Sequence, residues 1–275
     1  AYGGKLVSCA FFDIFGRATP LCMKWNPTDG RLVVGGTKSM KFFAVDGDQL
    51  RCTPAVYSHG ARKGYAACSV ISLTFLPDGS TFGGTVKGDV YKYEEGGVRA
   101  VRKFTGVHHG PIHDMCFTGK ALVTAGKDGK IKLWSVFMQP MFELNLAKAK
   151  ETMLDEYYST LSFQSGRSPS IRALAATVDG RTLAVGTSTS EVFEIDISQT
   201  REVAAASAKL VIQGHAAAVD PRTGKDIGDV WGLCMHPNKP KFATVGEDNT
   251  LRIWSLKNKK MTSHKRLPGA GRSVA

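Results

Sequence analysis

Residues 122–136 read LVTAGKDGKIKLWSV, and residues 242–256 read FATVGEDNTLRIWSL. Each stretch consists of an apolar strand, a short polar turn and a second strand in which apolar and polar side chains alternate. Five residues of the first stretch recur in the second, at a constant offset of 120 positions. They are Thr124, Gly126, Asp128, Trp134 and Ser135, which recur as Thr244, Gly246, Asp248, Trp254 and Ser255. Self-similarity of this kind predicts a repeat architecture.

Three weaker copies of the pattern lie elsewhere in the chain. They are LVVGGTKSMKFFAV from Leu32, TFGGTVKGDVYKYE from Thr81 and LAVGTSTSEVFEID from Leu183. The position at the end of the second strand is held in the five copies by Phe43, Tyr93, Trp134, Ile195 and Trp254, with spacings of 50, 41, 61 and 59 residues. The shortest spacing has the length of a WD repeat, about 40–45 residues. The longer spacings need loop insertions, which we place at 148–169 and 216–229.

Each copy is preceded by another strand and a turn. These segments are LCMKWNPTDG (21–30), VISLTFLPDG (70–79), IHDMCFTG (112–119), IRALAATVDG (171–180) and VWGLCMHPN (230–238). Asp-Gly between alternating strands is a strong hairpin signal, because glycine takes positive φ without strain. A less regular fourth strand follows, for example at 141–147 and 208–213. Four short antiparallel strands per repeat form the blade of a β-propeller.

The sequence therefore predicts an all-β fold, a WD-repeat β-propeller segment with five complete four-stranded blades and partial blades at its ends. We place the complete blades at about 17–46, 65–95, 108–147, 170–213 and 214–256, and a partial blade at 257–275, within a single segment covering 1–275. Residues 5–12 resemble an outer strand, and residues 268–275 resemble the opening strand of a further blade. We expect the chain to be a segment of a longer protein.

The composition is that of a globular domain that needs no external staple. A chain of 275 residues can bury roughly three quarters of its unfolded surface. The six cysteines form no C-x-x-C pair, which argues against a zinc site, and several lie in apolar strand-like runs. We expect free thiols and a reducing, cytoplasmic compartment. The cysteines are Cys9, Cys22, Cys52, Cys68, Cys116 and Cys234.

Copies three and five carry the same four polar residues. These are His108, Thr124, Asp128 and Trp134, matched by His215, Thr244, Asp248 and Trp254. A hydroxyl, a histidine and an acid could form a protease-like triad, but their presence in two blades argues against catalysis. In WD repeats such a set is a structural network: the aspartate holds the histidine, the histidine bonds the hydroxyl, and the hydroxyl bonds the indole N–H. We expect this network to satisfy buried polar groups.

The other copies have lost this set. The corresponding residues are Gly83, Lys87 and Tyr93 in blade two, and Val185, Thr189 and Ile195 in blade four. These blades are expected to rely on apolar packing alone. The remaining histidines do not cluster at metal-ligand spacing, and the glycine pairs are not followed by a phosphate-loop lysine. We therefore expect no catalytic residue, metal or cofactor.

The chain is basic, with lysine and arginine exceeding aspartate and glutamate by 12. This charge favours a polyanionic partner. The richest basic run is expected on the link between blade five and the next blade, with two smaller groups elsewhere; the alternative for each group is a solvated loop. The protein-binding candidates are Lys257, Lys259, Lys260, Lys265, Arg266, Arg62 and Lys63, and the remaining group is Arg99, Arg102 and Lys103. Aromatic residues do not interleave with these groups, which argues against nucleic acid.

Several segments resemble the echinoderm microtubule-associated protein-like family. Residues 229–256 (DVWGLCMHPNKPKFATVGEDNTLRIWSL) are similar to its WGL-x-x-HP blade opening, and residues 107–117 (VHHGPIHDMCF) to its H-x-GPI blade start. Residues 87–104 resemble its GDVY-type strand, and residues 267–275 its next blade opening. The similarity covers roughly residues 56–275. The sequence shows neither the family's amino-terminal coiled coil nor a clear hydrophobic HELP motif.

The resemblance implies a non-enzymatic protein with tandem propellers that decorates microtubules in the cytoplasm, in some members within the axoneme of cilia. Its expected partners are tubulin and other cytoskeletal or axonemal proteins, rather than nucleic acid or a membrane. Two alternatives stay open. One is a general WD-repeat adaptor that assembles another protein complex. The other is an enzyme with an active site in the central channel, which would need converging ionisable residues on the inner strands.

Overall fold

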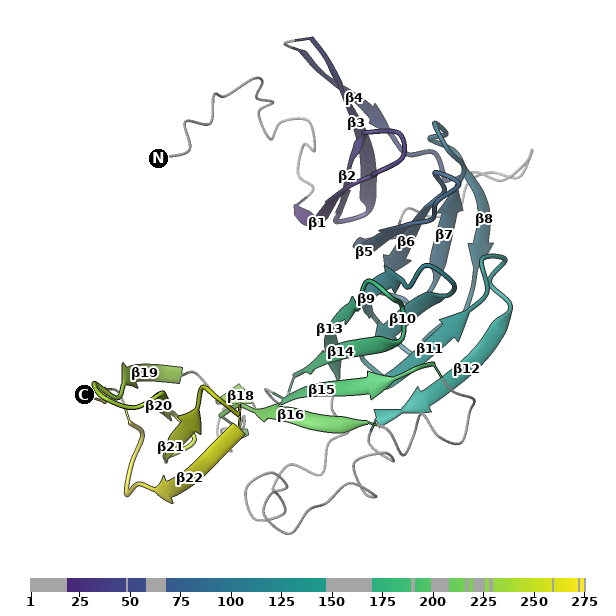
Figure 1. Ribbon diagram of the computed structural model, residues 1–275. Coiled ribbons are helices and arrows are strands. Elements are labelled where there is room, and N and C mark those ends of the chain that lie inside the picture. The colour runs from purple at the N-terminus through teal and green to yellow at the C-terminus, as the bar shows by residue number, and fades with distance from the viewer. Residues whose placement is uncertain are drawn as a thin grey trace. The chain divides into compact units, whose positions relative to one another are not determined.

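The computed structural model describes residues 19–47, 49–57, 68–146, 170–188, 191–198, 208–215, 218–219, 226–227, 230–258, 260–271 and 273–274. The strands of this part form five four-stranded antiparallel sheets and one two-stranded sheet (Figure 1). In each four-stranded sheet, the strands follow one another in sequence order. The all-β prediction of four-stranded WD-repeat blades is therefore confirmed. We call each of these sheets a blade and number the blades one to five along the chain.

The chain divides into two compact units, residues 1–143 and 144–275. The division lies next to the insertion predicted at 148–169, which is outside the described residues. The first unit contains blades one and two and nearly all of blade three. These blades are β1 (Pro20–Trp25), β2 (Leu32–Gly36), β3 (Ser39–Asp46) and β4 (Gln49–Pro54); β5 (Val70–Phe75), β6 (Thr81–Thr85), β7 (Val90–Tyr93) and β8 (Ala100–Phe104); and β9 (Ile112–Phe117), β10 (Leu122–Gly126), β11 (Lys130–Trp134) and β12 (Pro140–Asn145).

The second unit contains blades four and five. They are β13 (Ile171–Ala176), β14 (Thr182–Thr187), β15 (Glu191–Asp196) and β16 (Lys209–Gln213), and β19 (Val230–Met235), β20 (Lys241–Gly246), β21 (Thr250–Ser255) and β22 (Lys260–Arg266). Between them, β17 (Ala218–Val219) pairs with β18 (Asp226–Ile227). Both strands of this short hairpin lie within the insertion that the sequence predicts at 216–229.

Three outer strands extend beyond the predicted blade boundaries. Blade one ends at Pro54 instead of residue 46, and blade two at Phe104 instead of residue 95. Blade five ends at Arg266, so the stretch 257–266 is not a link to a partial blade but a turn and the fourth strand of blade five. Outer strands have a neighbouring strand on one side only, and β4 and β22 lie mostly exposed. They therefore lack the apolar alternation that marks the other strands, and backbone pairing alone defines them.

The first strand of every blade carries a β-bulge at its second residue. The bulged residues are Leu21, Ile71, His113, Arg172 and Trp231. A bulge inserts one residue into the alternation of side chains. The first, fourth and sixth residues of the strand consequently share one side of the sheet, which we call the front face of the blade. This explains the spacing of the apolar residues in VISLTF and IHDMCF.

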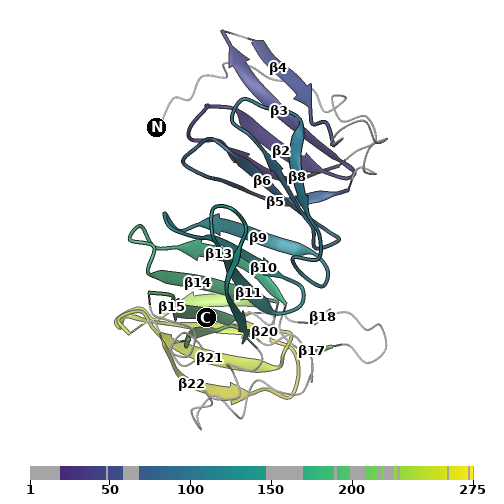
Figure 2. The same ribbon diagram turned by 90° about the vertical axis from the view of Figure 1, so that its right-hand side faces the viewer.

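The core of the first unit lies between neighbouring blades. Val33 and Phe42 of blade one belong to one apolar cluster with Leu73 of the front face of blade two. Phe82 of blade two belongs to a second cluster with Met115 of the front face of blade three. The first strands β1, β5 and β9 pack in series, and Figure 1 shows them along one side of this unit. Figure 2 shows the stacking of the sheets of blades one and two.

Glycines in the second strands permit this close packing. A Cβ atom on Gly35 would lie 2.8 Å from the carbonyl oxygen of Val70, the first residue of blade two. A Cβ atom on Gly84 would lie 3.0 Å from Cγ2 of Ile112, the first residue of blade three. Any larger residue would force the neighbouring first strand outwards. The glycine pairs of the sequence are therefore packing positions.

Front faces differ in how far they are covered. Leu73 and Met115 are completely buried, whereas Met23 in β1 and Leu233 in β19 are each 64% exposed. In the second unit, blades four and five contact mainly through their outer strands β16 and β22. Residues 268–271 and 273–274 lie next to blade five: Gly271 N–H donates to the carbonyl of Gly246 at 3.1 Å, and the Cα of Ser273 lies 3.0 Å from the place of a Cβ on Gly232. They form no strand there.

The difference between front faces predicts different costs for equivalent substitutions. Met115→Ala should lower the free energy of unfolding by about 2–5 kcal/mol, because it leaves a cavity between blades two and three. Leu233→Ala, at the equivalent position of β19, should cost less than about 1 kcal/mol, because the side chain is mostly solvated. Urea denaturation of both variants beside the parent protein measures this. An equal loss in both would show that the front face of blade five is covered in solution.

Candidate functional site

In blade three, a chain of hydrogen bonds joins the turn to the end of the strand. His108 lies between Asp128 and Thr124, with Nδ1 2.9 Å from Asp128 Oδ1 and Nε2 2.8 Å from Thr124 Oγ1. The indole N–H of Trp134 donates to Thr124 Oγ1 at 2.9 Å. Nδ1 of His108 therefore faces the carboxylate, and the Thr124 hydroxyl bonds Nε2 while it accepts from the indole N–H.

This arrangement has the order of a nucleophile, a base and an acid, but no substrate can reach it. Thr124 is completely buried and His108 is 2% exposed. One lone pair of the hydroxyl accepts the indole N–H of Trp134. A nucleophile needs both an exposed oxygen and room for the attacked carbon. The geometry therefore supports a structural role for the network.

Hydrogen bonding to the carboxylate dominates the electrostatics of the Asp128 turn. Burial by itself raises the pKa of Asp128, but the hydrogen bond and charge of His108 and the backbone N–H groups of His109 and Lys130 lower it to about 2. These two amides lie 3.0 and 3.2 Å from the carboxylate oxygens. The same carboxylate therefore holds the histidine and closes the turn between β10 and β11.

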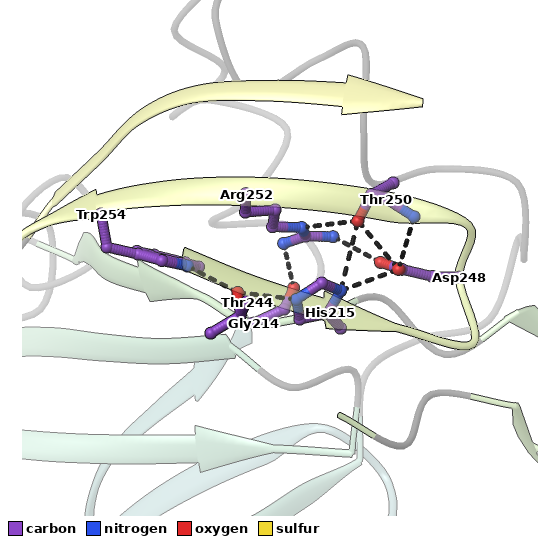
Figure 3. A network of polar contacts seen from close by, with 7 residues as sticks. All are labelled: Gly214, His215, Thr244, Asp248, Thr250, Arg252 and Trp254. Carbon is purple, nitrogen blue, oxygen red and sulfur yellow. Dashed lines mark hydrogen bonds and ion pairs between the residues drawn. The ribbon is translucent and has the colours of Figure 1, made fainter. Parts of the chain in front are cut away.

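Blade five contains the corresponding network in an extended form (Figure 3). His215 Nδ1 lies 2.7 Å from Asp248 Oδ1, and Nε2 lies 2.8 Å from Thr244 Oγ1. The indole N–H of Trp254 donates to Thr244 at 2.8 Å, and its ring stacks on Phe242 with centroids 5.9 Å apart. Thr244 and Trp254 come from β20 and β21, which places the network across the middle of the sheet.

Arg252 is a buried, charged member of this network that the comparison of the two repeat copies did not identify. Its side chain is fully enclosed and donates to Asp248 Oδ2 at 2.7 Å, to Thr250 Oγ1 at 3.0 Å and to the carbonyl of Gly214. Burial lowers the pKa of Arg252, and the charge of Asp248 and its hydrogen bond oppose this. The sequence contains a signal for this role. Thr250, Arg252 and Trp254 are two residues apart in β21, so their side chains lie on the same side of the strand, where the network is. Thr250 O–H also donates to Asp248 at 2.8 Å.

Blades two and four contain a different turn network, so the prediction that they rely on apolar packing alone is wrong. In blade two, Asp89 N–H donates to Thr85 Oγ1 at 3.0 Å, and the Asp89 carboxylate accepts from Gly106 N–H at 3.1 Å and pairs with Lys103 Nζ at 2.8 Å. In blade four, Thr187 O–H donates to Glu191 at 3.3 Å.

In blades two and four, the acidic residue lies two positions later in the repeat than Asp128 does in blade three, at the position of Lys130. A threonine followed four residues later by an acid, as in TVKGD and TSTSE, is the sequence signal for it. The turn is anchored in either case, by an acid in the turn itself or by an acid at the start of the third strand.

The described cysteines are all free, and only Cys68 is fully buried. Burial raises the pKa of Cys22 to about 11 and that of Cys116 to about 12, so both thiols stay protonated and weakly nucleophilic near neutral pH. Cys9 lies outside the described residues. Among the described residues, no group of three potential metal ligands occurs, and no helix has the length and apolarity to cross a membrane.

The basic run of blade five lies on one exposed strand. Lys260, Lys265 and Arg266 belong to β22, and Lys257 lies in the turn before it. All four are exposed, and His264 lies exposed between them in β22, a member that the sequence analysis omitted. Lys259, Arg62 and Lys63 lie outside the described residues. The structure therefore places four of the seven binding candidates together.

Several cations elsewhere in the described structure have internal partners. Arg51 pairs with Asp46 at 2.7 Å, Lys103 pairs with Asp89, and Lys132 pairs with Glu143 at 3.1 Å. Arg102 lies over the ring of Phe104 with its guanidinium carbon 5.0 Å from the centroid. Among the described residues, the four cations and His264 at β22 form no ion pair. β22 and the turn before it therefore carry a group of four exposed cations that enter no ion pair with the described residues.

The lowered pKa of Asp128 predicts a pH-dependent stability. The unfolded carboxyl titrates near 3.8 and the folded one near 2. The ionised form therefore stabilises the fold fully above the unfolded pKa, by about 2 kcal/mol, and this contribution is lost as pH falls through the folded value. Asp128→Asn should be less stable than the parent near neutral pH, and the difference should shrink between pH 3.8 and about 2. Urea denaturation at several pH values measures this.

Asp78→Asn is the matched control, because Asp78 also lies in a hairpin turn but is exposed. Its substitution should change stability little at any pH. A difference between Asp128→Asn and the parent that does not vary over the acid range would show that the carboxylate charge is not what anchors the turn.

Comparison with known proteins agrees with this geometry. The chain matches the family model described as WD domain, G-beta repeat, at residues 99–135 and 222–255, which contain the Asp128 and Asp248 turns. It is 24% identical over 239 residues to echinoderm microtubule-associated protein-like 2 of Mus musculus, covering 86% of this chain and 30% of the relative. It is 24% identical to echinoderm microtubule-associated protein-like 1 of Homo sapiens, covering 84% of this chain and 24% of the relative.

The similarity extends to echinoderm microtubule-associated protein-like 3 of Homo sapiens, at 24% identity, with 85% of this chain and 24% of the relative covered. The chain thus spans less than a third of the length of each of these relatives. The chain therefore contains matches to the WD domain, G-beta repeat, model in four-stranded blades, and it is similar over most of its length to echinoderm microtubule-associated protein-like proteins.

Proposed function

We propose that this chain is a non-enzymatic scaffold segment that associates with microtubules through the basic edge of blade five. The observation that carries the proposal is the set of cations at β22 that have no internal partner: Lys257, Lys260, Lys265 and Arg266. Unpaired cations on one surface raise the local positive potential and steer an acidic partner towards it. The names of the relatives supply the partner, because they describe microtubule-associated proteins.

The position of the cations also supports a binding role. They are exposed on the outer strand and its preceding turn, whereas Thr244 and Trp254 of the network are buried. A partner can therefore contact the basic edge without disturbing the fold. The proposed location is the cytoskeleton in the cytoplasm, and the ciliary axoneme is one microtubule structure where the same contact could be made.

A second candidate function, a general WD-repeat adaptor, is favoured by a different observation. The front face of blade five exposes Val230, Leu233 and Met235, each by at least half of its surface. Exposed apolar patches of this kind mark protein–protein contacts. An adaptor that binds through this face would depend little on salt, whereas the proposed microtubule contact depends on charge.

Charge reversal of β22 tests the proposed function. The triple variant Lys260→Glu, Lys265→Glu and Arg266→Glu should lose about tenfold or more in affinity for polymerised tubulin, because attractive contacts become repulsive. Its melting temperature should stay close to that of the parent, since these side chains are exposed and enter no ion pair with the described residues. Co-sedimentation with microtubules measures the affinity. Exposed charges act over a Debye length of about 8 Å at physiological salt, so binding by the parent should weaken as salt rises.

The matched control is the triple variant Lys120→Glu, Lys127→Glu and Lys239→Glu, which changes the net charge equally at other exposed lysines. It should keep most of the binding. Equal losses in the two triple variants would reduce the contact to a general attraction between a basic protein and an acidic polymer. If neither salt nor the β22 substitutions change the affinity for microtubules, the contact is made through the apolar front face, which favours the adaptor function.

A further inference from the structure

We infer that β22 binds its partner by strand addition: an extended, acidic segment of the partner pairs with the free edge of β22 as a fifth strand of blade five. The inference rests on the proposed function, since it assigns a binding geometry to the same basic strand. It adds the chemical nature of the ligand, which is a contiguous run of acidic residues in extended conformation.

Beyond a bulge at Thr262, the stretch Ser263–Arg266 of β22 pairs regularly with β21 and offers its other edge to an added strand. Within the part of the chain that the structure describes, blade five is ordered β19-β20-β21-β22, and no strand hydrogen-bonds to the other side of β22. β16 touches β22 without pairing with it. An edge strand leaves a row of N–H and C=O groups unpaired, and these can accept another strand. β22 has seven residues, contains no proline and exposes all its side chains except that of Met261.

Outer strands of the first unit are protected against strand addition. β4 ends on Pro54 and β12 begins on Pro140, and proline cannot donate to a ladder. The start of β8 is covered by the connection from blade one, where Val56 accepts from Ala100 N–H at 2.8 Å. Within the described structure, β22 is longer than each of these three strands and has neither device.

The charges on β22 select which strand can be added. Lysine on an edge strand commonly prevents pairing with other edges, and here it would repel a second copy of β22. The same charges favour an acidic strand, because opposite charges on neighbouring strands stabilise the pairing. A contact made only by side chains would also attract acidic groups, and the test below separates the two modes.

Register shows that both sides of the sheet carry these cations. Lys260 and Lys265 are opposite Ser255 and Leu251, whereas Arg266 is opposite Thr250, on the network side of β21. An added strand has alternate side chains on opposite sides. A ligand that is acidic at every position therefore meets cations on both sides, whereas one that alternates acidic and apolar residues meets them on one side only.

Peptide binding to the whole chain tests the inference. The probe is a fluorescein-labelled peptide of about eight glutamates, long enough to span β22. The matched control peptide has the same charge and length but is N-methylated at every residue, which removes its N–H donors and blocks both of its edges. The unmodified peptide should bind about tenfold or more tightly than the N-methylated one, because only it can form the backbone ladder. Hydrogen exchange at the β22 amides should slow when it binds.

The protein variants give the second comparison. Lys265→Glu with Arg266→Glu should abolish binding of the unmodified peptide, whereas Lys120→Glu with Lys127→Glu should retain it. Equal affinity for the two peptides, with no change in exchange at β22, would overturn strand addition and leave a contact through side chains only. Failure of both peptides to bind, while microtubules still co-sediment through β22, would overturn the acidic run as the ligand. Peptide binding as expected without microtubule binding would instead overturn the proposed function.

Discussion

Packing of one blade against the first strand of the next is the constraint on which the described first unit depends. A four-stranded sheet has two faces and no interior, so its apolar side chains are buried only by a neighbouring sheet. Val33 and Phe42 are buried against blade two, and Phe82 is buried against blade three. The close approach requires Gly35 and Gly84 in the second strands. The bulge in each first strand sets which of its residues reach the preceding blade.

Polar networks complete this packing where the apolar core ends. The turn between the second and third strands leaves backbone N–H groups and a carboxylate partly buried, and such groups are costly if they lack partners. Blades three and five solve this with Asp128 and Asp248, which also hold a histidine that precedes the first strand. Blades two and four use Asp89 and Glu191, two positions later. The two solutions alternate from blade two to blade five, and each ties the turn to its own sheet.

Arg252 shows how a charge is accommodated inside a blade. A buried guanidinium is tolerated only when its donors are occupied and its charge is balanced. Asp248 balances the charge, while Thr250 and the carbonyl of Gly214 accept further hydrogen bonds. Gly214 immediately follows β16, so this contact also ties the end of blade four to the network of blade five. At β22, by contrast, the cations are solvated and unpaired, which separates the residues that hold the blade from those available to a partner.

The sequence alone determined the repeat, the strand and turn pattern of the blades, and the four residues that the networks around Asp128 and Asp248 share, but not Arg252. These features are local or recur at a fixed offset, so alternation, turn residues and identity between copies are enough to find them. Tertiary structure decided the outer strands β4, β8 and β22, because backbone pairing with a neighbour defines them and their side chains lack an apolar pattern. It also decided that Lys103 is used inside the fold whereas Lys265 is not, and that Met115 is covered whereas Leu233 is not. Each of these pairs consists of similar residues in similar strands. What separates them is the acid or the sheet that a distant part of the chain places beside them, and no local pattern carries that information.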